Sequence, residues 1–354
     1  MKLRILGVLL LVSLMATSGF AVNYTWISTT GGSWSTGGAE PNHWNAVPPT
    51  GGAYNDEYRF YGPATKGGGG TVDNAVGSFN GRIRVSWDKP ADSNAARLNI
   101  VTGGSISIAE LRAGDQGLSA SAGSYGEVIQ TGGTVTMIVS SSGTSYSRNI
   151  ILGRGGSSGP AAEGLYKISG GTITYNSTMT SNDAKLMVGA SPNVTGATGK
   201  FIVSGDTAGI TMKSLWVGSD GTAGRGGTGT MQFDVASSGV SKVVLDSNVI
   251  LDNLGASSTA NLVVNLLSTA PTTDLVLIET KSAIAVSGLF DSLNGGSAIE
   301  GATVVLGGTT FALTYVYDAV SGNHTGGNDI ALIIPEPATI ALLSLGLLAI
   351  RRKK

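Results

Sequence analysis

The stretch GLYKISGGTITYNSTMTSNDAKLMVG, residues 164–189, contains three short segments that recur along the chain. The first leads into a Gly-Gly pair at 170–171, the second is Thr-Ile-Thr at 172–174, and the third is Leu-Met-Val before Gly189. Apolar side chains alternate with Lys, Ser or Thr in the first two, the third is apolar, and turn residues separate the three. This pattern predicts three short β-strands in each repeat.

The segment that ends at Gly189 has four copies, at 111–114, 150–153, 186–189 and 215–218, whose closing glycines lie 39, 36 and 29 residues apart. The Gly-Gly or Gly-Asp segment recurs at 99–104, 128–133, 166–171 and 201–206. The third recurs at 105–107, 134–136 and 172–174, with Ile210-Thr211 delayed by an insertion in the fourth copy. Repeats of three strands predict an all-β fold, a right-handed parallel β-helix (β-solenoid) over residues 97–252.

Equivalent positions of successive coils should stack in ladders. In the four-residue element the first and third side chains point to one side of a strand and the second to the other. We therefore expect two inward ladders: Leu111, Ile150, Leu186 and Leu215, and Ala113, Leu152, Val188 and Val217. The outward stripe is Arg112, Ile151, Met187 and Trp216. It is either a glycan- or partner-binding face or a stripe covered by a loop or by the capping module.

Composition excludes several kinds of site. The chain has no cysteine and only two histidines, His43 and His324, which lie near opposite ends. Disulfides, zinc sites and a Ser-His-Asp arrangement are therefore not expected, and we predict no metal site and no cofactor. Outside the two terminal signals the chain carries 16 Lys and Arg against 22 Asp and Glu, a balance that disfavours nucleic acid as a partner.

Parallel β-helices can host polysaccharide lyases or hydrolases, whose sites need carboxylates that converge from adjacent coils. The aligned residues before the four-residue element are Glu110, Asn149, Lys185 and Ser214, and those after it are Asp115, Arg154, Ala190 and Ser219. Neither column stacks two carboxylates, so the chain is not expected to be an enzyme, although a lyase or hydrolase remains an alternative. Asp115, Asp183 and Asp220 could bind a cation but are more typical of turns.

The two ends of the chain have separate roles. Lys2, Arg4 and the apolar run 5–15 predict a signal peptide over 1–21, cleaved between Ala21 and Val22.

Residues 22–96 should form an N-terminal cap and the first β coils. Its tryptophans, Trp26, Trp34 and Trp44, resemble the opening of autotransporter-like β-solenoid proteins, and a glycan-binding site is the alternative reading. Residues 253–334 are predicted to form a C-terminal β capping module.

The last residues form a distinct tail over 335–354. Pro335, Glu336 and Pro337 precede the apolar run 338–350, and Arg351, Arg352, Lys353 and Lys354 end the chain. The apolar run predicts a single membrane helix whose cations stay in the cytoplasm. This order resembles the PEP-CTERM sorting signal of Gram-negative bacteria.

That resemblance implies partners and a destination. It implies an exosortase-like processing enzyme, transient insertion into the inner membrane, and export to the cell surface or extracellular matrix. It also implies a structural protein that is associated with exopolysaccharide or biofilm. A glycan-binding surface protein is the alternative function.

Overall fold

The computed structural model describes residues 23–26, 32–33, 57–60, 69–73, 75–88, 96–115, 124–139, 148–154, 162–179, 183–189, 197–219, 226–251, 258–281, 283 and 286–335. Within these ranges all regular structure is β-strand and no helix occurs. The predicted signal peptide and all of the sorting tail after Pro335 lie outside the described residues.

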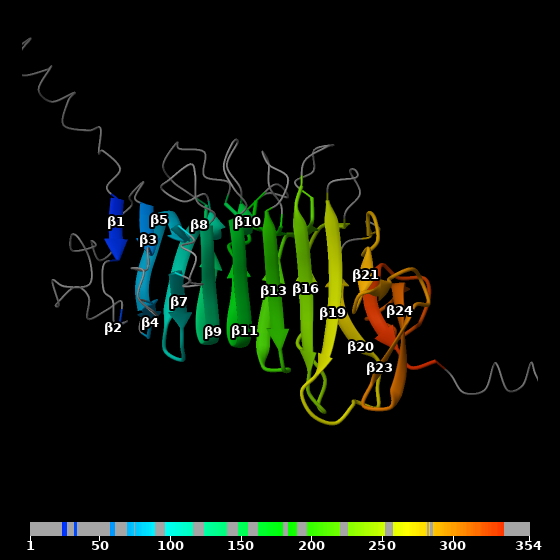
Figure 1. The fold of residues 1–354 in the computed structure, drawn as a ribbon. Helices are drawn as coiled ribbons and strands as arrows, with labels where there is room; N and C mark the ends of the chain where they lie inside the picture. The colour runs from blue at the N-terminus through cyan, green and yellow to red at the C-terminus, as the bar shows by residue number, and fades with distance from the viewer. Residues whose placement is uncertain are drawn as a thin grey trace, which may run out of the picture.

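The strands stack into a solenoid with three sheet faces, and pairing between coils within each face is parallel (Figure 1). Face A contains β2 (Gly32–Ser33), β4 (Gly69–Val72), β7 (Ala96–Ile100), the first part of β9 (Ser124–Met137) and of β11 (Ala162–Tyr175), β13 (Thr198–Ser204), β16 (Thr228–Val235), β19 (Thr259–Leu266) and β21 (Ser292–Leu293).

Face B contains the first part of β5 (Ala75–Val85) and of β8 (Ser105–Asp115), the second part of β9 and of β11, and then β14 (Ala208–Met212), β17 (Val243–Leu245) and β20 (Leu275–Thr280). Face C contains β1 (Asn23–Trp26), β3 (Glu57–Phe60), the second part of β5 and of β8, β10 (Ile150–Arg154), β12 (Lys185–Val188), β15 (Ser214–Val217) and β18 (Val249–Leu251). The predicted β-solenoid is confirmed.

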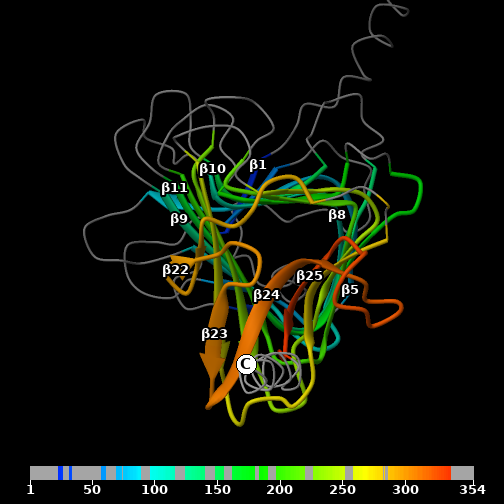
Figure 2. The ribbon, with the colours of Figure 1, turned by 90° about the vertical axis from the view of Figure 1, so that its right-hand side faces the viewer.

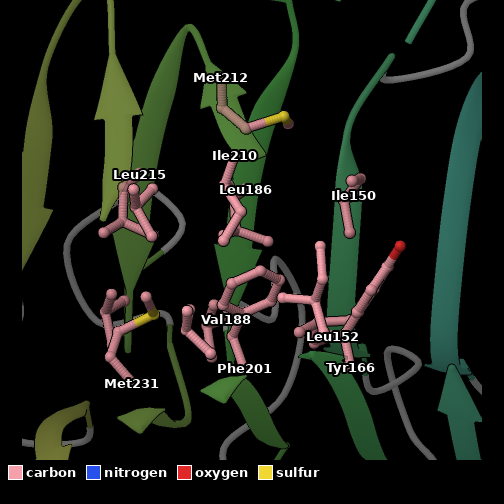
Figure 3. Packing of buried hydrophobic residues seen from close by; sticks show 14 of the residues in the cluster. Ile150, Leu152, Tyr166, Leu186, Val188, Phe201, Ile210, Met212, Leu215 and Met231 are labelled. Atoms are coloured by element: carbon pink, nitrogen blue, oxygen red, sulfur yellow. The ribbon is translucent and has the colours of Figure 1, made fainter. Parts of the chain in front are cut away.

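The two predicted inward ladders are confirmed on face C. Leu111 pairs with Ile150, Leu186 stacks next, and Leu215 follows, all nearly inaccessible to solvent. Faces A and B supply the other walls of the core, and Figure 3 shows Tyr166 and Phe201 beside Leu152 and Val188 of the second ladder. One polar group enters the core with its partners, because the Tyr166 hydroxyl donates to Oε1 of Gln130 at 2.6 Å. The delayed position of Ile210 is also confirmed, since it pairs with Ile173.

Glycines make the corner between faces C and A. The glycines that follow the face C strands have φ between +61° and +70°, a region that favours glycine: Gly114, Gly153, Gly189 and Gly218. A second column, Gly126, Gly164, Gly199 and Gly229, has one residue in each of the face A strands β9, β11, β13 and β16. A Cβ on Gly164 would lie 2.1 Å from the carbonyl oxygen of Ala113 and 2.3 Å from the amide nitrogen of Gly153. The backbones of neighbouring coils thus meet where no side chain fits.

The C-terminal module closes the stack with antiparallel pairing (Figure 2). β25 (Asp329–Ile333) lies between β20 and β24 (Thr309–Tyr317), and β24 also pairs with β23 (Thr303–Leu306). The other short strands are β6 (Trp87–Asp88), which pairs with β9, and β22 (Gly296–Ser297), which pairs with β21. Asp329 is buried and accepts hydrogen bonds from the backbone of Thr280 and Ala319 at 2.6 and 2.7 Å. The module therefore covers the last open coil, as such a stack requires.

The corner glycines give a test of the packing. Gly164→Ala should lower the free energy of unfolding by about 1–3 kcal/mol or more, because its Cβ collides with backbone and not with a movable side chain. Gly205→Ala is the control, since Gly205 has φ +75° but nothing within 4 Å, so its cost is backbone strain of about 1 kcal/mol. Chemical denaturation of both purified variants measures the difference. Equal losses would show that the close approach does not limit the corner.

Candidate functional site

Six charged side chains form a network on the outer side of face C, at the N-terminal coils. We call Arg82, Arg84, Glu110, Arg112, Asp115 and Arg154 the arginine cluster. The strand register brings them together, because Arg82 pairs with Glu110, Arg84 with Arg112, and Asp115 with Arg154 across β5, β8 and β10. Side chains at outward positions of adjacent parallel strands are about 5 Å apart, so opposite charges meet across the coils.

Arg112 lies at the centre of the arginine cluster. Its Nη1 is 2.9 Å from Oδ2 of Asp115, and its Nε donates to Glu110 on the same strand. Arg82 Nε approaches Oε2 of Glu110 at 3.1 Å, and Arg84 Nε approaches Oδ2 of Asp115 at 2.9 Å. Arg154 is farther away, with Nη1 3.9 Å from Oδ1 of Asp115. Glu110, Arg112 and Asp115 are buried, so each carboxylate is held by guanidinium groups in a setting that water barely reaches.

The electrostatics favour the charged state of Asp115. Burial alone would raise the pKa of Asp115, but Arg112, Arg84 and Arg154 outweigh it and lower the pKa below its ordinary value. Burial opposes the charge of Arg112 as well, yet Asp115 and Glu110 raise its pKa. The pKa of Arg154 is lowered by burial and then by the nearby charge of Arg112. A carboxylate with a lowered pKa is a poor general acid, so this arrangement is suited to holding coils together.

The aligned repeats did not reveal this cluster, because Arg82 and Arg84 precede the first recognised repeat. The signal was present: residues 82–85 read Arg-Ile-Arg-Val and align with Glu-Leu-Arg-Ala at 110–113. Of the other acids considered for a cation, Asp183 lies 3.1 Å from Nη1 of Arg148, and Asp220 lies outside the described residues. In the part of the chain that the structure describes, no three acidic or histidine side chains gather as a metal site would need.

The rest of the outward stripe on face C is apolar and largely buried. Ile151 and Met187 form a small cluster of their own, against which Trp216 packs. Nζ of Lys185 lies 4.0 Å from the centre of the Trp216 ring, a cation–π contact, and burial lowers the pKa of this lysine. Within the described ranges Nε1 of Trp216 has no hydrogen-bond partner. A sugar could stack only on a ring face that Lys185 does not cover, and glycan binding by Trp216 stays a prediction.

A shallow groove of about 290 Å³ lies on the outer side of face A. Tyr125, Leu165 and Ile202 supply its apolar surface, and Glu163 and Lys200 supply opposite charges at its edges. The Tyr125 hydroxyl donates to Glu127 at 2.6 Å, and Glu127 also binds Arg97. An aromatic ring beside hydroxyl, carboxylate and ammonium groups can contact both the C–H face and the hydroxyls of a sugar. The repeat alignment gave no sign of this groove, which joins three coils.

The sorting tail leaves the folded body without a spacer. Ile333 is the last residue of β25, and the amide nitrogen of Ile334 donates to Oδ1 of Asp274 at 2.8 Å. Oδ2 of Asp274 also contacts Nε2 of His324 at 2.9 Å, so the exit point is anchored to two loops. Pro335 is exposed directly after it. The structure thus presents the first residue of the Pro-Glu-Pro motif at the surface of the cap.

The remaining predicted site residues fall elsewhere. Trp26 is the last residue of β1, but its side chain is not described, and Trp34, Trp44, Ala21 and Val22 lie outside the described residues. The same is true of Glu336, Pro337 and the four terminal cations. Over the described ranges no helix is long and apolar enough to cross a membrane. The predicted C-terminal membrane helix falls beyond those ranges and stays a prediction.

Removal of one charge should expose the role of the arginine cluster. Asp115→Asn leaves the buried Arg112 and the half-buried Arg84 with fewer partners, and breaking a buried pair typically lowers stability by about 3–5 kcal/mol. The pKa of Asp115 is lower in the folded protein than its ordinary value of 3.8. The Asp115 carboxylate therefore contributes fully to the free energy of unfolding above pH 3.8, and this contribution is lost as the pH falls through the pKa of the folded protein. Denaturation between neutral pH and about pH 2 should show a weaker acid dependence in the variant. An unchanged acid profile would contradict this account.

Comparison with known proteins identifies the tail but not the body. Residues 334–354 match the PEP-CTERM protein-sorting motif. No curated protein and no solved structure matches the chain. The motif covers only the tail. It indicates an exported protein sorted by this signal, through the inner membrane to the cell envelope or surface of a Gram-negative bacterium.

Proposed function

We propose that this chain is a structural protein of the cell surface or extracellular matrix, associated with exopolysaccharide or biofilm and processed at its tail by an exosortase-like enzyme. The observation that carries the proposal is the PEP-CTERM motif attached without a spacer to a capped, elongated β-solenoid. A solenoid of this kind offers long, flat outer faces that suit contact with an extended polymer.

The proposed role is non-catalytic. Glu110 and Asp115 are two buried acids on the same strand of face C, and both are paired with arginines. Asp183 is likewise paired with Arg148. A lyase or hydrolase would need a carboxylate free to exchange a proton with the substrate. The acids that the fold gathers are instead used to join coils, which favours a structural role.

The groove on face A is the proposed contact with polysaccharide. It joins β9, β11 and β13, so a sugar chain lying along the stack would cross three coils. The Tyr125 ring supplies a stacking surface, and Glu163 and Lys200 supply hydrogen-bonding groups at the groove edge. This observation also favours the second candidate function, a glycan-binding surface protein.

The sorting role is tested in the producing bacterium. Glu336→Ala should block processing while still allowing insertion, so a full-length, membrane-bound form should accumulate. Asp206→Ala is the matched control, because Asp206 is an exposed carboxylate on a turn of the solenoid and should be dispensable. Cell fractionation and mass measurement of the exported protein give the result. A mature extracellular form that still carries residues 338–354 would overturn the proposal.

The glycan contact is tested with the producer's own purified exopolysaccharide. Tyr125→Ala should weaken binding about tenfold, since stacking on an aromatic ring contributes roughly 1–1.5 kcal/mol. Tyr125→Phe keeps the ring and should bind nearly as well. Release of reducing or unsaturated sugars would support the lyase or hydrolase alternative, and no binding by the wild-type protein would contradict the association.

A further inference from the structure

The exposed large apolar side chains of the described residues concentrate at the C-terminal end of the stack. They are Leu267, Leu289, Ile299, Val305, Val316 and Val320, and all belong to the last coil or to the closing module. Val305 is 64% exposed and Leu267 is 55% exposed, although the solenoid faces before them expose no such side chain within the described ranges. Exposed aliphatic side chains that gather at one end of a molecule favour an interaction surface there.

Two of these side chains border the point where the tail leaves. Val305 pairs with Thr310 on β24, and Ala312, two residues further along β24, pairs with Ile333 at the end of β25. Since adjacent strands are about 4.8 Å apart, Val305 lies roughly 10 Å from the exit. Gly307, in the turn after β23, approaches Leu266 and Ala270, so the loop that begins at Leu267 borders the same end. We call Leu267, Val305 and Pro335 the exit rim.

The tether between the exit rim and the membrane is very short. Only residues 335–337 separate Ile334 from the apolar run that begins at Ala338. Because an extended chain spans at most about 3.6 Å per residue, four steps reach no more than roughly 14 Å. An enzyme that binds the Pro-Glu-Pro motif at the outer membrane interface must therefore approach the exit rim itself. Such a short tether also gives the rim a high effective concentration, so a small contact area is sufficient.

The charge of the C-terminal module favours a protein surface over the lipid surface as the partner of the exit rim. Residues 258–335 contain six carboxylates, a single lysine and no arginine. An acidic module is repelled by anionic lipid headgroups, which attract basic segments instead. An exposed aliphatic rim without nearby cations fits an apolar patch on a protein.

We propose that the exit rim docks on the outward surface of the membrane enzyme that processes the tail. This inference rests on the proposed sorting function and adds a second contact to it. The Pro-Glu-Pro motif identifies the substrate, and the rim holds the folded body against the enzyme while the tail is processed. The stack then stands with its C-terminal end towards the membrane and its groove on face A away from the docked end.

The experiment measures processing of the full chain by pulse–chase in the producing bacterium. Val305→Asp and Leu267→Asp should each slow processing several-fold, because a carboxylate at the rim would be desolvated on docking. Val316→Asp is the matched control. Val316 is also an exposed valine of the module, but it lies beside Tyr317, which pairs with Asp329 at the opposite end of β25. The Val316→Asp variant should therefore be processed at the wild-type rate. Equal melting temperatures of the three mature variants show that folding is intact.

A linker variant and Glu336→Ala distinguish the two levels of the proposal. Ten Gly and Ser residues inserted between Ile334 and Pro335 should slow processing. In a protein that carries this linker, the additional change Val305→Asp should cause no further slowing. If Glu336→Ala blocks processing but the rim variants are processed normally, docking is wrong and the sorting function stands. If Glu336→Ala is also processed normally, the sorting function fails. Binding of the mature protein to vesicles of phosphatidylethanolamine and phosphatidylglycerol is measured as well. If the wild-type protein binds them and Val305→Asp does not, the exit rim contacts lipid and the proposed docking on the enzyme is wrong.

Discussion

The close approach of backbones at the corner between faces C and A is the constraint on which the rest of the structure depends. Gly164 fits against the carbonyl of Ala113 and the amide of Gly153, and Gly199 fits in the same way against Leu152 and Gly189. Only hydrogen atoms can occupy this space at the four central coils, so these positions must be glycine, and the same column continues with alanine, Ala96 and Ala260, in the coils on either side. The corner is thereby fixed independently of the segment that connects its two glycines, and those segments differ in length between repeats. A regular stack can therefore tolerate irregular repeats.

The buried outward stripe of face C is stabilised by ion pairs in one part and by apolar contacts in another. At the N-terminal coils the stripe is ionic, with Arg112 between Glu110 and Asp115, and at later coils it is apolar, with Met187 beside Trp216. Buried charges are stable only when they are paired and hydrogen-bonded, which the alternation of Arg82 and Glu110 across coils provides. The same pairing makes these carboxylates unsuitable for proton transfer. The stability of the cluster and the poor fitness of Asp115 for proton transfer thus have one physical origin.

The cap links the fold to the sorting signal. β25 is a central strand of the closing sheet, and its end is bound through Ile334 to Asp274. The folded body therefore extends to the residue before the Pro-Glu-Pro motif. An unstructured spacer would have isolated the tail from the body, whereas this arrangement places the surface of the cap directly beside the first residue of the motif, as the proposed docking requires. The exposed aliphatic side chains lie at that end of the molecule.

The sequence by itself determined the repeat, the inward and outward positions on face C, and the nature of the tail. These features are local, since alternation within four residues assigns Leu186 and Val188 to the core, and the order of motif, apolar run and cations is contiguous. Only the tertiary structure decided the partners of Arg82 and Arg84, the bond between Tyr166 and Gln130, the groove beside Tyr125, and the fit of Gly164 against Ala113. The pairwise contacts join residues 28 to 51 positions apart in the chain, and the groove brings together residues of three coils. Because the repeats vary in length, such contacts follow from the stacking register, which the strands acquire only when the coils pack.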